Sequence, residues 1–417
     1  MARKKTAIKK IKPREGLKLF VLFGFILAMS NALNAYIHSS FLSQYLGEKW
    51  VGAVITAAYV LAFFAVNNLA TAINRLKIFK TATIVFIALV VCLFTLGANA
   101  SAWLAIMAFI IYLAFLDLIW ILMDVYVEYF SRDRVTGRIR GWYLTLINIA
   151  WLVSPITSGY LIKQGGYQIL FLVSSFLTLL VLGGFVWGFK DLAVDHFKKY
   201  RFREAVKKIY RNKLINGIFV VSFLLNAFYC TIVVYAPLYL NKYVGFSWSD
   251  IGVMFTIMLS TFVFLTYPAG WLADKVLGEK EILSLGLLIM GLSCLVCAFL
   301  TAASFWLWTA VLFISRVGAS LVAIMTDTYF FKRIDVQDGQ LIHFFRNTTT
   351  LAYMVMPLVV TFFLVISGYQ AVFLATGLIV LSGMYFSWNL KDTLLDFWVL
   401  SSSLGEVFCL PKGANLL

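Results

Sequence analysis

Residues 166–171 read GYQILF, and residues 368–373, 202 positions later, read GYQAVF. Other residues recur at nearly the same spacing and in the same order along the chain. These pairs are Gly52 with Gly252, Asn74-Arg75 with Asp274-Lys275, Asp124-Val125-Tyr126 with Asp327-Thr328-Tyr329, and Pro155 with Pro357. Self-similarity at a fixed period is the sequence signature of an internal repeat. The chain is therefore predicted to consist of two homologous halves with the same topology.

The composition places the chain outside the range of soluble proteins. Of its 417 residues, 62% are hydrophobic and only 13% are charged, whereas soluble domains carry about 45–50% apolar and ~25% charged residues. This balance excludes a soluble enzyme, a disordered chain and a disulfide scaffold. The apolar runs are long and continuous rather than alternating, which excludes a membrane β-barrel.

No pattern typical of a cofactor site or a catalytic site is found in the sequence. Cys294 and Cys297 have the spacing of a metal or redox pair, but they lie within an apolar stretch. Small packing residues are therefore the better interpretation of these cysteines. The sequence has no phosphate-binding loop, no zinc-site spacing and no Ser-His-Asp arrangement. We expect no metal, no cofactor and no enzymatic activity.

Apolar runs between charged clusters define twelve candidate membrane spans. About 20 apolar residues cross a bilayer as a helix, and in hydrocarbon every backbone amide must bond within its own segment. The runs are residues 19–41, 50–73, 80–98, 103–129, 141–162, 168–189, 214–240, 250–273, 281–301, 305–330, 341–366 and 370–390. The prediction is an all-α integral membrane protein with twelve transmembrane helices in two pseudo-symmetric six-helix halves.

Lysine and arginine residues are concentrated in alternate loops. The net charge of +16 comes from 35 Lys and Arg against 19 Asp and Glu. The N-terminal arm, the tail and every second loop hold most of the basic residues, and the other loops hold only Lys49, Lys163 and Lys242. Because basic loops stay on the cytoplasmic side, both termini are predicted to be cytoplasmic in a multi-pass protein of the plasma membrane. The positive charge indicates topology, and no nucleic-acid partner is expected.

The spans divide the chain into five predicted parts. These are a basic cytoplasmic arm (1–18), a first six-helix half (19–189), a basic amphipathic linker (190–213), a second half (214–390) and a cytoplasmic tail (391–417). Basic residues in the linker alternate with aromatic and aliphatic ones, which favours contact with anionic headgroups of membrane lipids. A plain connection between the halves explains the same stretch, so both interpretations stay open.

Several short motifs resemble the major facilitator superfamily of secondary transporters. That family often carries G-x-x-x-D-[RK]-x-G-[RK] after its second helix and a weaker copy after the eighth. Residues 270–280 (GWLADKVLGEK) follow this pattern with one extra residue, whereas residues 70–75 (ATAINR) lack the Gly and the Asp. The two GYQ motifs are similar to the family's G-[WY]-[RQ]-x-x-F at the start of helices six and twelve. Residues 154–159 (SPITSG) are a partial likeness to the G-P-x-x-G-G signature of proton-coupled exporters.

Two charged residues fall deep inside predicted spans. Asp117 lies 14 residues into the fourth span and Arg316 lies 11 residues into the tenth, roughly 21 Å and 16 Å from the span starts. A charge at mid-membrane costs at least about 2.5–3.5 kcal/mol, so it marks a functional position by default. In the family that the chain resembles, helices one, four, seven and ten line the central cavity. Asp117 and Arg316 are therefore expected to face each other across it.

Asp117 is expected to carry a coupling proton or to neutralise a cationic group of the substrate. Arg316 would be its counter-charge or would anchor an anionic substrate group, and a buried pair that only fixes helix packing is the alternative. Polar residues of other spans are expected to complete the substrate and proton pathway. They are Asn31, Asn34, Asn148, Asn226, Tyr229 and Tyr353. For each of these, an interhelical hydrogen bond of about 0.6 kcal/mol is the alternative.

Charged residues near the cytoplasmic span ends are predicted to form an inner gate. They are Asp124, Glu128, Arg132, Asp274, Lys275, Asp327 and Arg333. Ion pairs there would form when the cytoplasmic side closes and break when it opens. Ordinary charge balance at helix ends is the alternative, and the recurrence of Asp124 as Asp327 favours the gate.

Together these features predict a secondary active transporter that moves a small molecule by alternating access, coupled to protons. The partial SPITSG motif favours an antiporter that exports a hydrophobic or cationic compound. The incomplete loop motif at residues 70–75 keeps import of a sugar, an organic acid or another nutrient as an alternative. A non-transporting sensor or partner subunit with a transporter fold is a further alternative. A monomer is expected.

Overall fold

The structure is a computed structural model that describes residues 13–130, 136–189, 202–273, 277–334 and 339–390. The described residues form helices and contain no strand. The helices are α1 (Pro13–Ala35), α2 (His38–Leu46), α3 (Glu48–Leu76), α4 (Ile78–Gly97), α5 (Ala102–Phe130), α6 (Thr136–Gly188), α7 (Phe202–Arg211), α8 (Lys213–Tyr229), α9 (Ala236–Tyr239), α10 (Trp248–Leu272), α11 (Gly278–Phe299), α12 (Phe305–Arg333), α13 (Gly339–Arg346) and α14 (Thr348–Trp388), with two π-helical segments, η1 (Cys230–Tyr235) and η2 (Leu240–Val244).

The described part of the chain contains nine helices that are long and apolar enough to cross a membrane, or ten if the bent pair α1–α2 counts as one span. Two of these helices are much longer than one crossing requires: α6 has 53 residues and α14 has 41. At 1.5 Å per residue they reach about 80 Å and 60 Å, against ~30 Å of hydrocarbon. Each contains a break near its middle, so each holds two of the predicted spans. All twelve predicted segments are therefore helical.

The breaks explain why the GYQ motif recurs. Gly166 in α6 has φ +67° and ψ −165°, and Gly368 in α14 has φ +72° and ψ −164°. This backbone region is accessible essentially to glycine alone. The first residue of each GYQ motif is therefore the point at which one span ends and the next begins.

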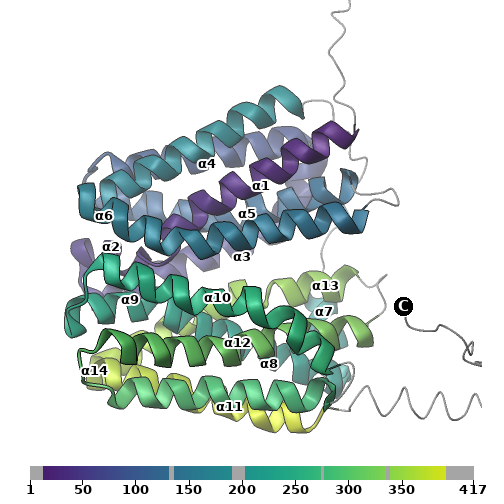
Figure 1. Ribbon diagram of the computed structural model, residues 1–417. Helices are drawn as coiled ribbons and strands as arrows, with labels where there is room; N and C mark the ends of the chain where they lie inside the picture. Colours follow the sequence, from purple (N-terminus) through teal and green to yellow (C-terminus); the bar gives the residue numbers. More distant parts are fainter. Residues whose placement is uncertain (1–12, 131–135, 190–201, 274–276, 335–338, 391–417) are drawn as a thin grey trace, which may run out of the picture.

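The helices form two bundles, and the repeat relates one bundle to the other. In Figure 1, α1 and α3 to α6 lie together, and α8, α10 to α12 and α14 lie beside them as a second group. We call the end of the molecule at which α1 begins and α14 ends the terminal end. The opposite end, at Gly47 and Gly245, is called the far end.

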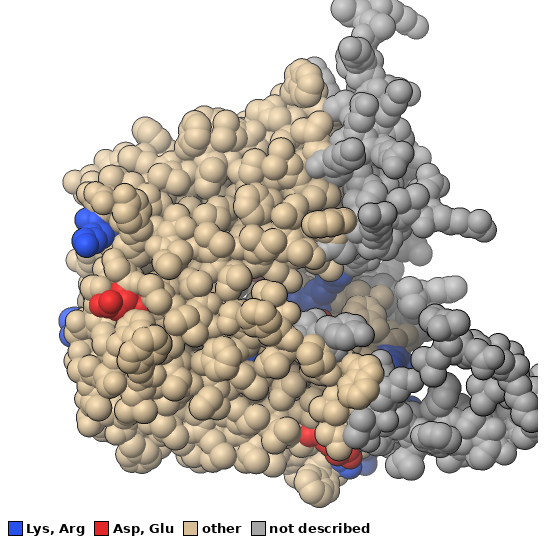
Figure 2. Space-filling view, in the orientation of Figure 1, with Lys and Arg blue, Asp and Glu red and all other residues tan. Residues whose placement is uncertain are grey.

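The outer surface of the described bundle suits a lipid environment. Large apolar side chains are well exposed along it, among them Phe64, Trp187 and Phe264. In Figure 2 the visible side is uncharged between the two ends, and the coloured Lys, Arg, Asp and Glu side chains lie at the ends. The described part of the predicted linker is the short helix α7, which buries Ile209 and exposes Lys207 and Lys208.

Two glycine contacts join the bundles near the far end. A Cβ atom on Gly52 in α3 would lie 2.4 Å from the carbonyl oxygen of Pro357 in α14. A Cβ atom on Gly252 in α10 would lie 2.5 Å from the carbonyl oxygen of Pro155 in α6. Gly52 matches Gly252 in the repeat, and Pro155 matches Pro357. The two interfaces between the halves are therefore equivalent, and both depend on the absence of a side chain.

Candidate functional site

A cavity of about 310 Å³ lies between the two halves, and we call it the Arg316 cavity. Tyr36, Asn148 and Trp151 line it from the first half, while Tyr229, Phe262, Arg316 and Tyr353 line it from the second. Four of the residues predicted for the substrate pathway are in this set: Asn148, Tyr229, Arg316 and Tyr353. The structure thus brings together polar side chains from four predicted spans in one cavity.

Arg316 is held in this cavity by aromatic rings. Its side chain is buried, and its guanidinium carbon lies 4.8 Å from the ring centroid of Tyr229 and 5.7 Å from that of Phe262. Cation–π contacts of this kind are worth about 2 kcal/mol or more when desolvated. The hydroxyl groups of Tyr36 and Tyr229 also interact with the guanidinium. Among the residues that the structure describes, none forms an ion pair with Arg316.

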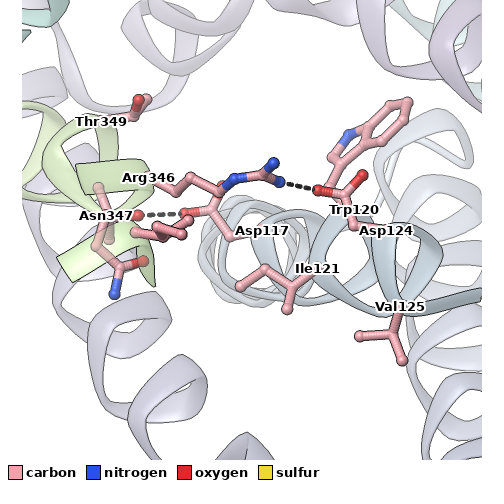
Figure 3. A pocket seen from close by; sticks show the side chains of 10 residues that line it. Asp117, Trp120, Ile121, Asp124, Val125, Arg346, Asn347 and Thr349 are labelled. Carbon is pink, nitrogen blue, oxygen red and sulfur yellow. Dashed lines mark hydrogen bonds and ion pairs between the residues drawn. The ribbon is translucent and has the colours of Figure 1, made fainter. Parts of the chain in front are cut away.

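Asp117 lines a different cavity, of about 330 Å³, which we call the Asp117 cavity. The hydroxyl of Thr350 donates a hydrogen bond of 2.8 Å to Asp117 Oδ2. Arg346 in α13 reaches across the same cavity to an ion pair with Asp124 in α5 (Figure 3). Asp117 belongs to the first half and Thr350 to the second, so this cavity also lies between the halves.

The structure does not bring Asp117 and Arg316 into contact. Counted from the far ends of their helices, Asp117 lies 15 residues into α5 and Arg316 lies 11 residues into α12. This four-residue difference corresponds to about 6 Å of depth. The predicted spans already gave a difference in depth of about 5 Å, but they could not reveal that each residue has its own partners. Tyr59, which interacts electrostatically with Asp117, and Tyr353, which lines the Arg316 cavity, have ring centroids 5.0 Å apart.

Of the three other predicted pathway residues, two form hydrogen bonds with helices. Asn34 is buried and donates to the carbonyl oxygen of Ser30, while Asn31 lines neither cavity. Asn226 accepts a 2.9 Å hydrogen bond from Thr349, which lines the Asp117 cavity. Asn226 thus adjoins this cavity.

The predicted inner gate is described in part. Asp124 pairs with Arg346, and Asp327 interacts electrostatically with the same arginine. The two repeat-related aspartates therefore share one cation, which the sequence did not single out. The guanidinium of Arg333 lies 5.6 Å from the ring centroid of Tyr329. The side chain of Glu128 and the residues Arg132, Asp274 and Lys275 lie outside the described residues.

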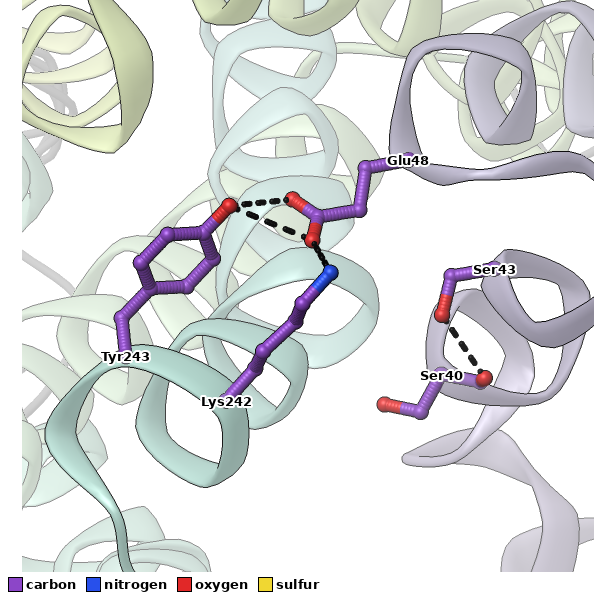
Figure 4. A network of polar contacts seen from close by, with 5 residues as sticks. All are labelled: Ser40, Ser43, Glu48, Lys242 and Tyr243. Atoms are coloured by element: carbon purple, nitrogen blue, oxygen red, sulfur yellow. Dashed lines mark hydrogen bonds and ion pairs between the residues drawn. The ribbon is translucent and has the colours of Figure 1, made fainter.

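A second set of polar contacts, at the far end, was not predicted. Glu48 at the start of α3 forms an ion pair with Lys242 of η2, and Tyr243 donates to its carboxylate oxygens at 3.0 and 3.2 Å (Figure 4). Lys242 is one of the three basic residues in the loops that otherwise lack them. This rarity is the one feature of the sequence that could have marked Lys242 as a contact residue. Its partner Glu48 lies 194 residues away in the chain, so spacing could not have indicated the pair.

The seventh predicted span (214–240) lies within the helical stretch Lys213–Val244, which departs from regular α-helix. Its two π-helical segments, η1 and η2, follow Tyr229 and precede Gly245. Short π-helical segments within a helix occur frequently at functional sites. Here one adjoins the Arg316 cavity and the other carries the contacts of Lys242 and Tyr243.

A membrane-spanning bundle of two repeated halves, with cavities and charged contacts between them, has the architecture of a secondary transporter. The model of the Major Facilitator Superfamily matches residues 19–265 and 231–394. The chain belongs to this family of transporters, and it is a multi-pass integral membrane protein rather than an enzyme.

The comparisons with solved structures agree on the fold. The peptide transporter POT in complex with sulfate gives a TM-score of 0.72 at 13% identity, covering 89% of this chain and 93% of that one. A point mutant of POT with sulfate gives the same TM-score and coverage at 12% identity. At these identities the likeness concerns the fold. No curated protein matches the chain.

Proposed function

We propose that the chain is a proton-coupled secondary transporter whose substrate binds in the Arg316 cavity. The observation that carries this proposal is the position of the cavity between the halves, with polar side chains from both. A relative movement of the halves would expose such a site to one side of the membrane and then to the other. In agreement with the distribution of basic residues, the terminal end would face the cytoplasm. Helix α7 would lie there against anionic lipid headgroups.

Contacts between the halves at both ends support alternating access. Glu48, Lys242 and Tyr243 join the halves at the far end, and Asp124 and Arg346 join them toward the terminal end. Opening either end requires the contacts at that end to break, while the other set remains. Ion pairs that repack between two arrangements are a common device of such transitions.

Asp117 is proposed as the proton-carrying group. It lines the Asp117 cavity together with Asp124, which is paired with Arg346, and its own partner Thr350 belongs to the opposite half. Protonation of Asp117 would therefore change the hydrogen bond with Thr350, which joins the two halves. Intramembrane carboxylates are typical of proton relays in transporters.

The structure favours an anionic substrate over a cationic one. A cation would meet the buried guanidinium of Arg316, which no described carboxylate neutralises. The SPITSG segment, which suggested export, makes packing contacts instead: Ser158 donates to the carbonyl oxygen of Leu33, and Pro155 packs on Gly252. Uptake of an organic acid together with protons is therefore the proposal that the site supports best.

The test uses liposomes that contain the purified protein and a pH-sensitive dye. Two pairs of cysteines, Glu48→Cys with Tyr243→Cys and Asp124→Cys with Arg346→Cys, are introduced into a variant without the five native cysteines. An organic acid should acidify the lumen with the uncross-linked protein. A bifunctional cross-link at either end should stop this, and the single-cysteine variants should not respond to the reagent. Flux that continues with both ends cross-linked would contradict alternating access.

A further inference from the structure

Arg316 has hydrogen-bonding capacity that the protein does not use. Its side chain is 3% exposed, and its Nε–H has no hydrogen-bond partner in the structure. The rings of Tyr229 and Phe262 contact the guanidinium, and the hydroxyls of Tyr36 and Tyr229 interact with it. Two hydroxyls cannot use all five of its N–H donors, and Nε–H is one that stays available. A guanidinium edge matches the two oxygens of a carboxylate, which it binds through parallel N–H donors.

The charge of Arg316 also lacks compensation within the cavity. Among the described residues that line it, Arg316 is the one cation and none is Asp or Glu. A buried charge without a partner is costly in an apolar surrounding. One bound anion would neutralise it, whereas a second negative charge on the same ligand would find no cation in the lining. The electrostatics therefore fit a ligand with a single negative charge.

The rest of the lining fits a small apolar body. Trp151, Phe262 and Leu259 contribute apolar surface, and Tyr36, Tyr353 and Asn148 contribute a few polar groups. A sugar would need hydrogen bonds around its whole rim, which this lining does not offer. The volume of about 310 Å³ is at the lower end of the range of ligand pockets, ~300–1,000 Å³.

We propose that the Arg316 cavity binds a small monocarboxylate with an apolar, ring-containing body. The carboxylate lies on the guanidinium edge of Arg316, and the ring lies against Trp151 and Phe262. This inference rests on the proposed function, because it takes the cavity to be the substrate site.

The experiment measures equilibrium binding of radiolabelled 3-phenylpropionate to the purified full-length protein in detergent. Three unlabelled competitors keep the phenyl ring and differ in charge: the neutral 3-phenylpropanamide, the cationic 3-phenylpropylamine and the dianionic phenylsuccinate. Unlabelled 3-phenylpropionate should displace the labelled compound. The other three competitors should bind at least about 30-fold more weakly, which is the ratio expected when a buried charge loses its partner. Arg316→Gln should weaken binding by a similar factor. Arg316→Lys keeps the charge but loses the paired N–H donors of the planar guanidinium. Its affinity for 3-phenylpropionate should lie between those of the wild type and Arg316→Gln.

Two controls keep the test decisive. Arg211→Gln makes the same change on the exposed face of α7 and should bind 3-phenylpropionate as the wild type does. Leu259→Trp fills the cavity while Arg316 stays intact, and it should abolish binding. Equal affinity for the amide or the amine, or wild-type binding by Arg316→Gln or Leu259→Trp, would overturn the proposal.

Failure of this inference can be told from failure of the proposed function. If the cross-links at both ends arrest transport of another compound, the chain is a transporter with a different substrate class. If 3-phenylpropionate binds as expected but is not carried into liposomes, the site is correct and the transport function is wrong.

Discussion

At the level of single residues, Asp117 and Arg316 line two different cavities, and we propose that they serve two different tasks, proton coupling and substrate binding. Each has partners of its own, Thr350 for Asp117 and Tyr229 for Arg316. If the two residues served as each other's counter-charge, removing one would disable the other. The separation in the structure implies that coupling and substrate binding can be lost independently.

Asp117→Asn is predicted to abolish proton movement while leaving substrate binding within about threefold of the wild type. An amide keeps the size and the hydrogen bond from Thr350 but cannot take up a proton in the physiological range. Substrate exchange across the liposome membrane should continue without a change of lumenal pH. Glu281→Gln, on the exposed start of α11, is the control and should retain both activities. If Asp117→Asn lost substrate binding as well as proton movement, the result would support a direct pairing of Asp117 with Arg316 instead.

Replacement of Tyr229 separates the role of its ring from that of its hydroxyl. Tyr229→Leu removes the cation–π contact with Arg316 and is predicted to weaken substrate binding by about 0.5–2 kcal/mol, roughly 2- to 30-fold. Tyr229→Phe retains the ring and should lose less. Equilibrium binding measures the affinity of each variant. Tyr210→Leu, on the exposed side of α7, is the matched control and should bind as the wild type does. A larger loss for the phenylalanine variant would mean that the hydroxyl, not the ring, positions Arg316.

At the level of helices, the contact between the halves depends on two glycines in equivalent positions. Gly52→Ala or Gly252→Ala would place a methyl group within 2.5 Å of a proline carbonyl oxygen when the far end is closed. Overpacking of this kind costs about 1–3 kcal/mol, and opening of the far end relieves it. Each variant is therefore predicted to shift the equilibrium toward a far-end-open state by about 5- to 150-fold.

The reactivity of a cysteine introduced at Tyr369, which is buried against Tyr243 at the far end, with a membrane-impermeant thiol reagent measures this shift. Reactivity should rise in both glycine variants, because the contact at Glu48 opens together with the far end. Gly183→Ala in α6 is the control, since a Cβ atom there meets no other atom within 4 Å. Unchanged reactivity in Gly52→Ala and Gly252→Ala would show that the two interfaces stay closed during the transport cycle.

The sequence predicted where helices lie better than how they deviate from regular form. Apolar runs located twelve segments that are all helical in the structure, because hydrophobic length is what the membrane selects. The same runs could not show the π-helical segments at Cys230 and Leu240 or the 46° bend between α1 and α2. These depend on packing between helices. The GYQ repeat did locate the breaks inside α6 and α14. At each break the backbone adopts a positive φ that favours glycine, which is why both motifs begin with one.

The candidate site was predictable to the extent that its residues are unusual in a membrane. Arg316 and Asn148 stood out because charge and amide groups are rare in spans. Trp151 and Phe262 did not, since core aromatics have the same sequence signature. Ion partners such as Glu48 and Arg346 required knowledge of which span ends meet in space. The repeat established that halves exist, but it carried no information on their contacts.

At the level of the whole molecule, the two sets of charged contacts oppose each other. The pair of Glu48 and Lys242 must break to open the far end, and the pair of Asp124 and Arg346 must break to open the terminal end. Glu48→Gln is therefore predicted to favour far-end opening, and Arg346→Gln to favour terminal-end opening. Each pair reaches solvent through a cation that is at least half exposed, Lys242 or Arg346. Ion pairs screened by solvent contribute about 0–1 kcal/mol, so each population ratio should change by up to roughly fivefold.

Distances between spin labels at each end measure both shifts in one experiment. Labels at the exposed Lys163 and Thr301 report the far end, and labels at the exposed Arg75 and Glu281 report the terminal end. Glu48→Gln should increase the population of long distances only in the first pair, and Arg346→Gln only in the second. The two substitutions act on opposite sides of one equilibrium. In the double variant the ratio of far-end-open to terminal-end-open molecules should therefore return toward that of the wild type. Both open states should gain population at the expense of the closed state. Opening of both ends by either single variant would mean that the halves separate rather than rock, and such a protein would leak its substrate instead of coupling it to protons.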